Sequence, residues 1–178
     1  MDLRTERTKS SIKSAFLELR KQKPLEKITV KELAELAYIN KATFYTHYHD
    51  IFDLADQLEN DFFDSTLKNV AYLDCLVSNP GLATKELTKA LAAQTDVANI
   101  LFSGSRQGYY SSKLTLALRK LIDEKYPEKV HDLKWNIVIT VLIQGCYHAA
   151  QLYQTENDLE EVTQILAAIS DSLTSQFL

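Results

Sequence analysis

The sequence predicts an all-α protein, and three observations lead to that fold class. The 178 residues include only 4 Gly and 3 Pro, which leaves little material for the many turns of an all-β fold. Helix-favouring residues such as Ala, Leu, Lys and Glu are abundant throughout the chain. Apolar residues recur every three or four positions between a few helix-breaking segments, as they do in amphipathic helices. The chain is long enough for one or two small domains with a hydrophobic core.

The first predicted helix spans residues 8–21. Its apolar side is formed by residues at helical spacing, namely Ile12, Ala15, Phe16 and Leu19. The polar residues 1–10 are expected to form a frayed arm. Pro24 ends this segment, because a proline biases the residue before it away from helical geometry.

Residues 28–50 predict two short helices separated by a turn. Thr29 and Glu32 form a Ser/Thr-x-x-Glu capping box, in which each side chain accepts a hydrogen bond from the backbone N–H of the other residue. The apolar stripe of the first helix consists of Val30, Leu33, Ala34 and Ala37. Asn40 is a favourable N-cap for the second helix, which is predicted over residues 41–48.

The second of these helices has a mainly polar outer surface. Phe44 and Tyr48 are expected to face the core. The residues left outward are Lys41, Ala42, Thr43, Tyr45, Thr46 and His47. Two short helices of this kind are typical of a helix-turn-helix, whose second helix enters the major groove of DNA.

The outward residues have the chemistry that DNA contacts need. Lys41 can donate to guanine or to a phosphate, Ala42 can touch a thymine methyl group, and Thr43 offers both a hydroxyl and a methyl group. Thr29 and Lys31, at the start of the preceding helix, are placed for phosphate contacts. For any of these residues the alternative is an ordinary solvated surface.

A longer set of residues at fixed spacing supports the same interpretation: Thr29, Val30, Leu33, Ala34, Ala37, Ile39, Asn40, Thr43, Phe44, Tyr45, His47, Tyr48, Asp50 and Leu54. In this arrangement the segment resembles the DNA-binding domain of TetR-type (tetracycline-repressor-like, TetR/AcrR) transcriptional regulators. The resemblance covers about a quarter of the chain. It implies an N-terminal three-helix helix-turn-helix DNA-binding domain, residues 1–50, followed by a helical C-terminal dimerisation and effector domain, residues 51–178.

The resemblance also implies roles for individual residues. The positions of Tyr45 and His47 contact the DNA backbone in that family, although packing at the domain edge is an equal alternative here. Two residues depart from the family pattern. Tyr38 stands where a turn glycine is usual, and Ile51 stands where a lysine normally opens the long connecting helix. His49 or Lys27 is a candidate substitute for the missing phosphate contact, and DNA affinity is expected to be lower.

The remaining chain predicts further helices. Asp50 is a predicted N-cap for a helix that continues to residue 77, roughly 40 Å at 1.5 Å per residue. Its acidic outer side is assigned to Asp56, Glu59, Asp61 and Asp64. Residues 78–81, Ser-Asn-Pro-Gly, form the clearest helix breaker. Later helices are predicted over residues 82–92, 96–102, 107–125, 132–153 and 159–177, with a corner at 103–105 and breaks at 126–128 and 154–158.

The last two predicted helices carry apolar residues on nearly every side. The resemblance implies that they pair with those of a second subunit in a four-helix bundle, where Gly145 and Ala149 would permit close approach of the helices. The alternative is that the helix over residues 132–153 is the buried central helix of a monomer.

The same family commonly binds a small molecule in its C-terminal domain. Aromatic and polar residues that could line such a pocket are Tyr72, Phe102, Tyr109, Tyr110, Trp135, Tyr147 and His148. Aromatic residues at helical spacing are more often core or interface residues, so both interpretations stay open.

Charge is divided unevenly along the chain. Residues 1–49 contain ten Lys and Arg against six Asp and Glu, whereas residues 50–178 contain ten against eighteen. The net charges are therefore +4 and −8, which sum to the formal −4 of the whole chain. A basic N-terminal part is attracted to phosphate and an acidic remainder is repelled by it. The charge distribution favours a DNA-binding N-terminal part.

Other classes of protein are less favoured. The sequence has no Gly-rich phosphate loop, no nucleophile elbow and no HExxH motif, so no enzyme activity, catalytic residue, metal site or cofactor is expected. Cys75 and Cys146 are expected to be buried thiols of a reducing cytosol. The charged start and the short apolar runs predict no signal peptide and no membrane span, hence a cytoplasmic, nucleoid-associated protein.

The sequence therefore predicts a homodimeric DNA-binding transcriptional regulator, a repressor rather than an activator. Its partners are a pseudo-palindromic operator and possible small-molecule effectors. The main alternative is a helical dimeric interaction protein whose helix-turn-helix has lost DNA binding. A small enzyme is the least favoured class.

Overall fold

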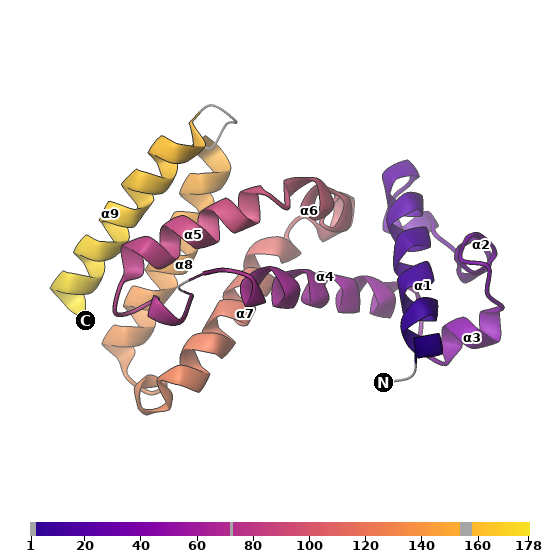
Figure 1. The fold of residues 1–178 in the computed structure, drawn as a ribbon, viewed down its shortest axis with the longest axis horizontal. Helices are drawn as coiled ribbons and strands as arrows, with labels where there is room; N and C mark the ends of the chain where they lie inside the picture. Colours follow the sequence, from indigo (N-terminus) through magenta and orange to yellow (C-terminus); the bar gives the residue numbers. More distant parts are fainter. Residues whose placement is uncertain (1–2, 72, 154–157) are drawn as a thin grey trace. The chain divides into compact units, whose positions relative to one another are not determined.

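The structure is a computed structural model that describes residues 3–71, 73–153 and 158–178. All regular structure in these residues is helical, which confirms the predicted all-α class (Figure 1). The α-helices are α1 (Leu3–Gln22), α2 (Val30–Leu36), α3 (Lys41–Tyr45), α4 (Ile51–Lys68), α5 (Pro80–Ala92), α6 (Thr95–Leu101), α7 (Tyr109–Lys125), α8 (Leu133–Tyr153) and α9 (Leu159–Phe177). Short 3₁₀ turns are η1 (Leu25–Lys27), η2 (Leu73–Cys75), η3 (Gly104–Arg106) and η4 (Pro127–Lys129).

The chain forms two compact units. The first consists of Met1–Phe62 and Asp96–Tyr110, and the second of Phe63–Thr95 and Ser111–Leu178. Helices α4, α6 and α7 contribute residues to both units. The first unit thus contains the whole predicted helix-turn-helix together with most of α6 and with η3. The functional division after residue 50 stays a prediction.

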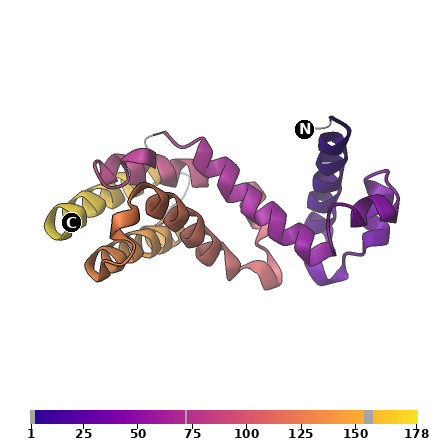
Figure 2. The ribbon, with the colours of Figure 1, turned by 90° about the horizontal axis from the view of Figure 1, so that it is seen from below.

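In the first unit, α2 and α3 lie on the same side of α1 (Figures 1 and 2). Ile12 and Phe16 of α1 are buried, as predicted. The helix itself begins at Leu3, so the frayed arm predicted over residues 1–10 is wrong for the residues described. The early residues favour helix, and the hydroxyl of Thr8 donates to the carbonyl of Arg4 at 3.0 Å within the first turns.

The predicted caps of α2 and α3 are confirmed. The Thr29 hydroxyl accepts from the Glu32 N–H at 3.2 Å, and the Glu32 carboxylate accepts from the Thr29 N–H at 3.2 Å. Asn40 Oδ1 accepts from the Thr43 N–H at 2.7 Å. Phe44 and Tyr48 are buried as predicted. These local bonds fix the start of each short helix.

Two predicted helix boundaries are wrong. Helix α3 ends at Tyr45 rather than near residue 48. The N–H of His47 leaves the helical pattern and reaches the carbonyl of Phe44, three residues back, at 2.9 Å. Helix α4 ends at Lys68 rather than near residue 77. The Asn69 side chain donates to the carbonyl of Ser65 at 2.9 Å and competes with continuation of the helix.

The predicted breaker at residues 78–81 is confirmed for Ser78 and Asn79, which lie outside any helix, whereas Pro80 and Gly81 already belong to α5. Asn79 is its N-cap and accepts from the Leu82 N–H at 3.3 Å, while Pro80 occupies the first turn, where no N–H is needed. The Gly81 N–H donates to Asp171 of α9 at 2.7 Å. A Cβ on Gly81 would lie 2.3 Å from that carboxylate, so a larger residue here would push the Asp171 side chain out of its present position.

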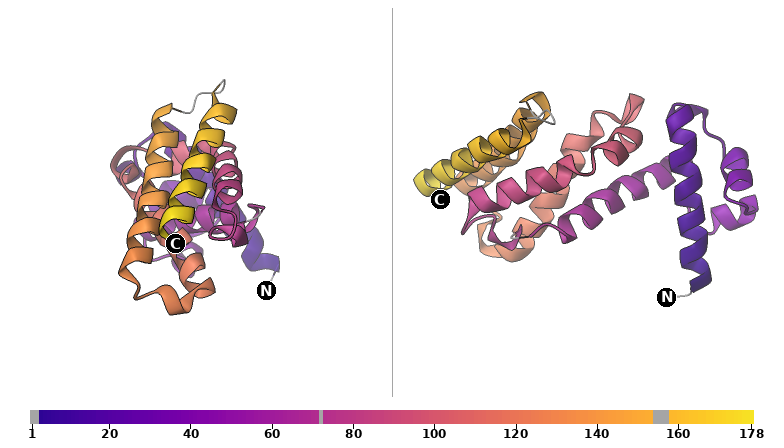
Figure 3. Two further views of the ribbon diagram at one scale, coloured as in Figure 1. Left: turned by 90° about the vertical axis from the view of Figure 1, so that its left-hand side faces the viewer. Right: turned by 45° about the horizontal axis from the view of Figure 1, so that its top comes forward.

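The second unit is built on α5, α8 and α9. Helices α8 and α9 run side by side in opposite directions (Figure 3), and α5 packs on α9 through small polar residues such as Thr84, whose hydroxyl donates to Ser170 at 2.9 Å. Trp135 of α8 is buried with Ile122 and Ile139. Cys75 and Cys146 are only partly buried, so the prediction that both are buried thiols is wrong. The predicted break at residues 154–158 lies mostly outside the described residues.

Glu160 joins the N-terminus of α9 to α5 electrostatically. Its carboxylate accepts from Lys85 and Lys89, each at 2.7 Å, and these bonds lower its pKa from 4.5 to about 2. Because the folded pKa is depressed, the stabilisation is present above pH 4.5 and is lost as pH falls towards 2.

We expect Glu160→Gln to unfold at a lower temperature than the wild type at neutral pH. The difference in Tm should narrow steadily as the pH falls from 4.5 towards 2, because the unfolded wild-type chain then binds a proton at Glu160 that the folded carboxylate does not. Thermal unfolding of both proteins across that pH range measures it. A difference that stayed constant across the range would mean that the carboxylate charge contributes nothing.

Candidate nucleic-acid interface

The residues predicted to contact DNA lie mostly on the outer surface of α2 and α3. Exposed side chains are those of Thr29, Lys31, Lys41, Ala42, Tyr45 and Thr46, whereas Thr43 and His47 are partly buried. Lys31 and Lys41 have no ion-pair partner among the residues that the structure describes. Their charges are therefore available to an external anion.

The hydroxyls of α3 are partly engaged within the helix. Thr43 donates to Asn40 Oδ1 at 2.9 Å, and Thr46 donates to the carbonyl of Thr43 at 2.7 Å. These bonds fix each side chain in one orientation. The remaining lone pairs and methyl groups can still meet base edges, so Thr43 can act as an acceptor or an apolar contact rather than as a donor.

The aromatic rings of Tyr45 and His47, at and just beyond the end of α3, pack against neighbouring aromatic rings. The Tyr45 ring lies edge-on to Phe44, with centroids 5.5 Å apart, yet Tyr45 is 57% exposed. The His47 ring lies 6.2 Å from that of Tyr48. Burial raises the pKa of Tyr48, which is consistent with its place in the core. Tyr45 thus combines a fixed ring with an accessible outer edge.

Glu32 lies beside the predicted phosphate contacts, and its charge is paired with a lysine. Glu32 accepts from Lys23 at 2.6 Å, and this bond, followed by those from Thr29, lowers the pKa of Glu32. Glu32 is thus engaged with Lys23, and the exposed Lys31 at the start of α2 stays outside that pair. A helix N-terminus with such a cation attracts phosphate.

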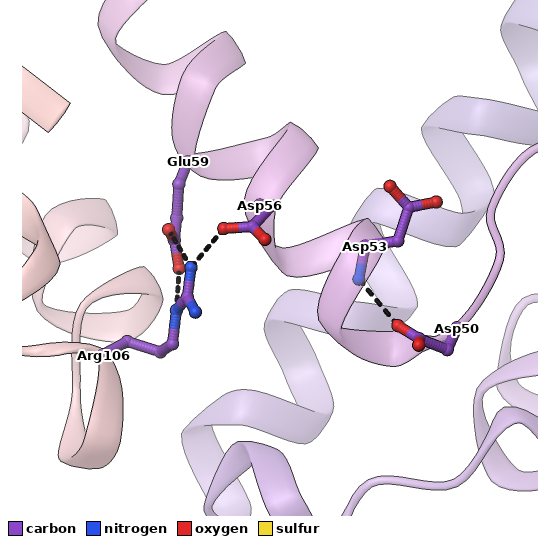
Figure 4. A network of polar contacts seen from close by, with 5 residues as sticks. All are labelled: Asp50, Asp53, Asp56, Glu59 and Arg106. Atoms are coloured by element: carbon purple, nitrogen blue, oxygen red, sulfur yellow. Dashed lines mark hydrogen bonds and ion pairs between the residues drawn. The ribbon is translucent and has the colours of Figure 1, made fainter. Parts of the chain in front are cut away.

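The start of α4 offers less to DNA. Asp50 Oδ1 accepts from the Asp53 N–H and Asp53 accepts from the His49 N–H, each at 2.8 Å, so these carboxylates occupy the helix N-terminus (Figure 4). Ile51 is buried in the core and gives no cation there. His49 and Lys27 are exposed and remain the candidate substitutes.

The turn between α2 and α3 is closed by two backbone bonds. The Tyr38 N–H reaches the carbonyl of Glu35 at 3.2 Å and the Ile39 N–H reaches that of Ala34 at 2.9 Å, which is a Schellman motif. The motif requires a left-handed residue, and Tyr38 has φ 55°. A non-glycine residue there costs about 1–2 kcal/mol. The turn keeps its usual geometry despite the missing glycine.

A network of charged side chains ties η3 to α4 and α1 in the first unit. Arg106 donates to both oxygens of Glu59 at 2.7 and 2.6 Å and to Asp56 at 2.5 Å (Figure 4). Arg20 of α1 donates to the carbonyl of Ser103 at 3.1 Å and to its hydroxyl at 2.5 Å. Hydrogen bonding to Glu59 raises the pKa of Arg106, so the guanidinium stays charged.

This network corrects one assignment made from the sequence. Glu59 was placed on the acidic outer side of the long helix, but its side chain is fully buried. The available signal was its position between Ala55 and Phe63, four residues away on either side, on the apolar stripe. Nothing in the sequence identified Arg106 as its partner.

The residues predicted to bind an effector are divided between the two units. In the first, Phe102 lies 6.0 Å from Phe62 and 4.9 Å from Tyr110, and Arg106 lies 4.0 Å above the Tyr109 ring. In the second unit, the ring centroid of Trp135 lies 5.3 Å from that of Tyr126, and the ring centroid of Tyr147 lies 5.1 Å from that of His148. Tyr72 lies outside the described residues. These contacts are those of packed aromatic clusters.

An apolar groove of about 500 Å³ lies along α8 and α9 in the second unit. Its lining residues are Leu133, Lys134, Ile137, Val138, Val141, Leu173 and Phe177. Ile137 and Val141 are 55% and 52% exposed, so α8 is not a helix buried on all sides, and the central-helix alternative is wrong. Exposed apolar residues continue beyond the groove with Leu152, Ile165 and Ile169. We call this set the α8–α9 face.

No protein-family model, no curated protein and no solved structure matches the chain. Within the described part of the chain, no helix is both long and apolar enough to cross a membrane. The same residues contain no cluster of His, Cys, Asp and Glu side chains placed to hold a metal ion.

Proposed function

We propose that the protein is a TetR-like DNA-binding transcriptional regulator, a repressor that binds a pseudo-palindromic operator as a homodimer. The observation that carries the proposal is the exposed surface of α2 and α3. It presents Lys31 and Lys41 without acidic partners, on two capped helices joined by a tight turn. Thr43 and Ala42 supply groups that can distinguish bases, while Thr29, Tyr45, Thr46 and His47 are assigned to the backbone.

The homodimer is supported by the α8–α9 face. Large apolar side chains exposed on it include Leu133 at 73% and Ile169 at 45%. Large exposed apolar side chains gathered on two neighbouring helices are typical of an interaction site in soluble proteins. A Cβ built on Gly145 of α8 would meet nothing within 4 Å, so the helix backbone there is open to a close partner. Two subunits would present two recognition helices to successive half-sites.

A release mechanism by a small molecule is part of the proposal. The aromatic clusters around Phe102 and around Trp135 are the places where an effector of aromatic or apolar character would be accommodated. The same aromatic side chains also pack against one another, so a purely structural role in stabilising the fold is an equal alternative.

One observation favours a second candidate. The start of α4 is occupied by Asp50 and Asp53, and Ile51 is buried, so a phosphate contact expected there is missing. An interaction protein with a degenerate helix-turn-helix is therefore the alternative function. It predicts an unchanged dimer and no DNA binding at low salt.

Two substitutions in the helix-turn-helix test the DNA-binding proposal. Thr43→Ala is expected to relax base preference, with a loss of about 1–3 kcal/mol on the preferred site only. Lys31→Ala is expected to weaken binding to all sequences alike and to reduce the slope of log K against log salt by about 1, because one phosphate contact is lost. Fluorescence anisotropy with a selected duplex and a scrambled duplex measures both.

The two variants serve as controls for each other, since Lys31 is exposed, Thr43 is only partly buried, and neither is part of the core. Unchanged site preference in Thr43→Ala, with unchanged affinity, would contradict the assignment of α3 as the recognition helix. Equal salt slopes for Lys31→Ala and the wild type would remove Lys31 from the interface.

A further inference from the structure

The turn residue Tyr38 has a backbone conformation that its side chain does not favour. It is the only non-glycine residue with positive φ among those described, at φ 55°. The Schellman bonds from the N–H groups of Tyr38 and Ile39 require this conformation, and glycine or asparagine adopts it readily. A bulky aromatic residue at this position therefore opposes folding.

Packing does not compensate for that strain. Tyr38 is 95% exposed, so its ring gains almost no burial on folding. Residues whose strained backbone is not offset by packing within the fold are found preferentially at functional sites. A favourable contact that offsets the strain of Tyr38 is then expected to come from another molecule.

The surroundings of Tyr38 indicate what that contact is. Tyr38 precedes the first residue of α3, Lys41, by three positions, so it stands next to the end of the recognition helix that enters the groove. It also borders a cleft of about 350 Å³ between α1 and the turn. The cleft is lined by hydroxyl groups from α1, those of Ser10, Ser11 and Ser14.

The charges around the cleft suit a phosphate backbone. Lys9 and Lys13 are exposed on the same stretch of α1 as the serines, and Lys41 is exposed beyond the turn. The one carboxylate that lines the cleft, Glu18, is engaged with Lys21 at 3.5 Å and with Gln22 at 3.0 Å. Neutral donors flanked by cations are the groups that typically hold DNA phosphates and sugars.

We propose that Tyr38 is a DNA-contacting residue that lays its ring against a deoxyribose of the operator and donates its hydroxyl to a phosphate at the α1 cleft. This inference rests on the proposed function. It explains why an aromatic residue replaces the glycine of the turn. It also supplies a backbone contact in place of the one that Ile51 cannot make.

The test compares Tyr38→Asn, Tyr38→Phe and the wild type in the full chain, by anisotropy on a duplex selected by the wild type and on a scrambled duplex. Asparagine tolerates positive φ, so the Tm of Tyr38→Asn should equal or exceed that of the wild type. Its affinity should fall about tenfold on both duplexes. The slope of log K against log salt should not change, because a neutral side chain releases no counterion. Tyr38→Phe should lose part of that affinity.

The outcomes separate the two levels of the proposal. If the wild type binds DNA and Tyr38→Asn binds with the same affinity, the proposed role of Tyr38 is wrong, whereas the DNA-binding function is unaffected. A loss confined to the selected duplex would overturn the backbone assignment, because a sugar–phosphate contact is independent of sequence. No binding by the wild type on any duplex would overturn both the proposed function and this inference.

Discussion

Arg106→Ala is expected to lower the free energy of unfolding by about 3–5 kcal/mol, because it leaves a buried carboxylate without its cation. Glu59 is fully buried and receives two hydrogen bonds from Arg106, at 2.7 and 2.6 Å. Asp56 also bonds Arg106 but is largely exposed and can turn to water. The loss should therefore arise almost entirely from Glu59. Urea unfolding monitored by circular dichroism measures it.

Two controls distinguish a buried ion pair from charge in general. Lys21→Ala removes an exposed pair with Glu18 at 3.5 Å, and such pairs contribute about 0–1 kcal/mol. Adding Glu59→Gln to Arg106→Ala removes the stranded charge and should recover part of the stability. If Arg106→Ala were as mild as Lys21→Ala, the network would not be holding η3 to α4.

The double substitution Ile137→Lys with Ile169→Lys is expected to convert the proposed dimer into monomers. Both side chains are about half exposed on the α8–α9 face, so the monomer should still fold. In a dimer the four lysines would be buried without partners, which is strongly unfavourable. Because one duplex then binds two separate monomers, operator affinity should fall by about 10²-fold or more.

Sedimentation velocity at micromolar concentration measures the oligomeric state, and anisotropy measures the affinity. The matched control is Leu116→Lys on α7, whose side chain is 69% exposed but lies outside the face. It should leave both the dimer and the affinity unchanged. A double variant that sediments like the wild type would contradict the assignment of this face.

Sequence reasoning succeeded where the determinants are local. The caps of α2 and α3 depend on residues three positions apart, Thr29 with Glu32 and Asn40 with Thr43, so a short pattern specifies them. The burial of Phe44 followed from helical periodicity in the same way.

It failed where a distant group or a competing side chain decides. The buried Glu59 is paired with Arg106, 47 residues away in the sequence, and no periodicity reveals such a partner. Helix α4 stops at Lys68 because of the Asn69 side chain, although the apolar pattern continues. The last two residues of the Ser-Asn-Pro-Gly segment start a helix because Asn79 caps it and Pro80 occupies the first turn.

The candidate site lies between these two cases. The outward surface of α3 followed from the sequence, since exposure on a short helix depends on its own periodicity. The proposed role of Tyr38 could be inferred only from its backbone φ together with the exposed fraction of its side chain, and neither follows from the sequence. Which surface pairs with a second subunit depends on groups of another chain, so a single chain offers only the exposed apolar residues as a signal.

The most direct test of the proposed function is selection of genomic DNA fragments by the full-length protein at low and moderate salt. The proposal predicts enrichment of fragments that share a pseudo-palindromic site, with half-sites about one helical turn or a multiple apart. It also predicts that the observed binding constant falls steeply with salt concentration. No enriched sequence at any salt concentration, from a protein that remains a folded dimer, would contradict it and favour the interaction protein instead.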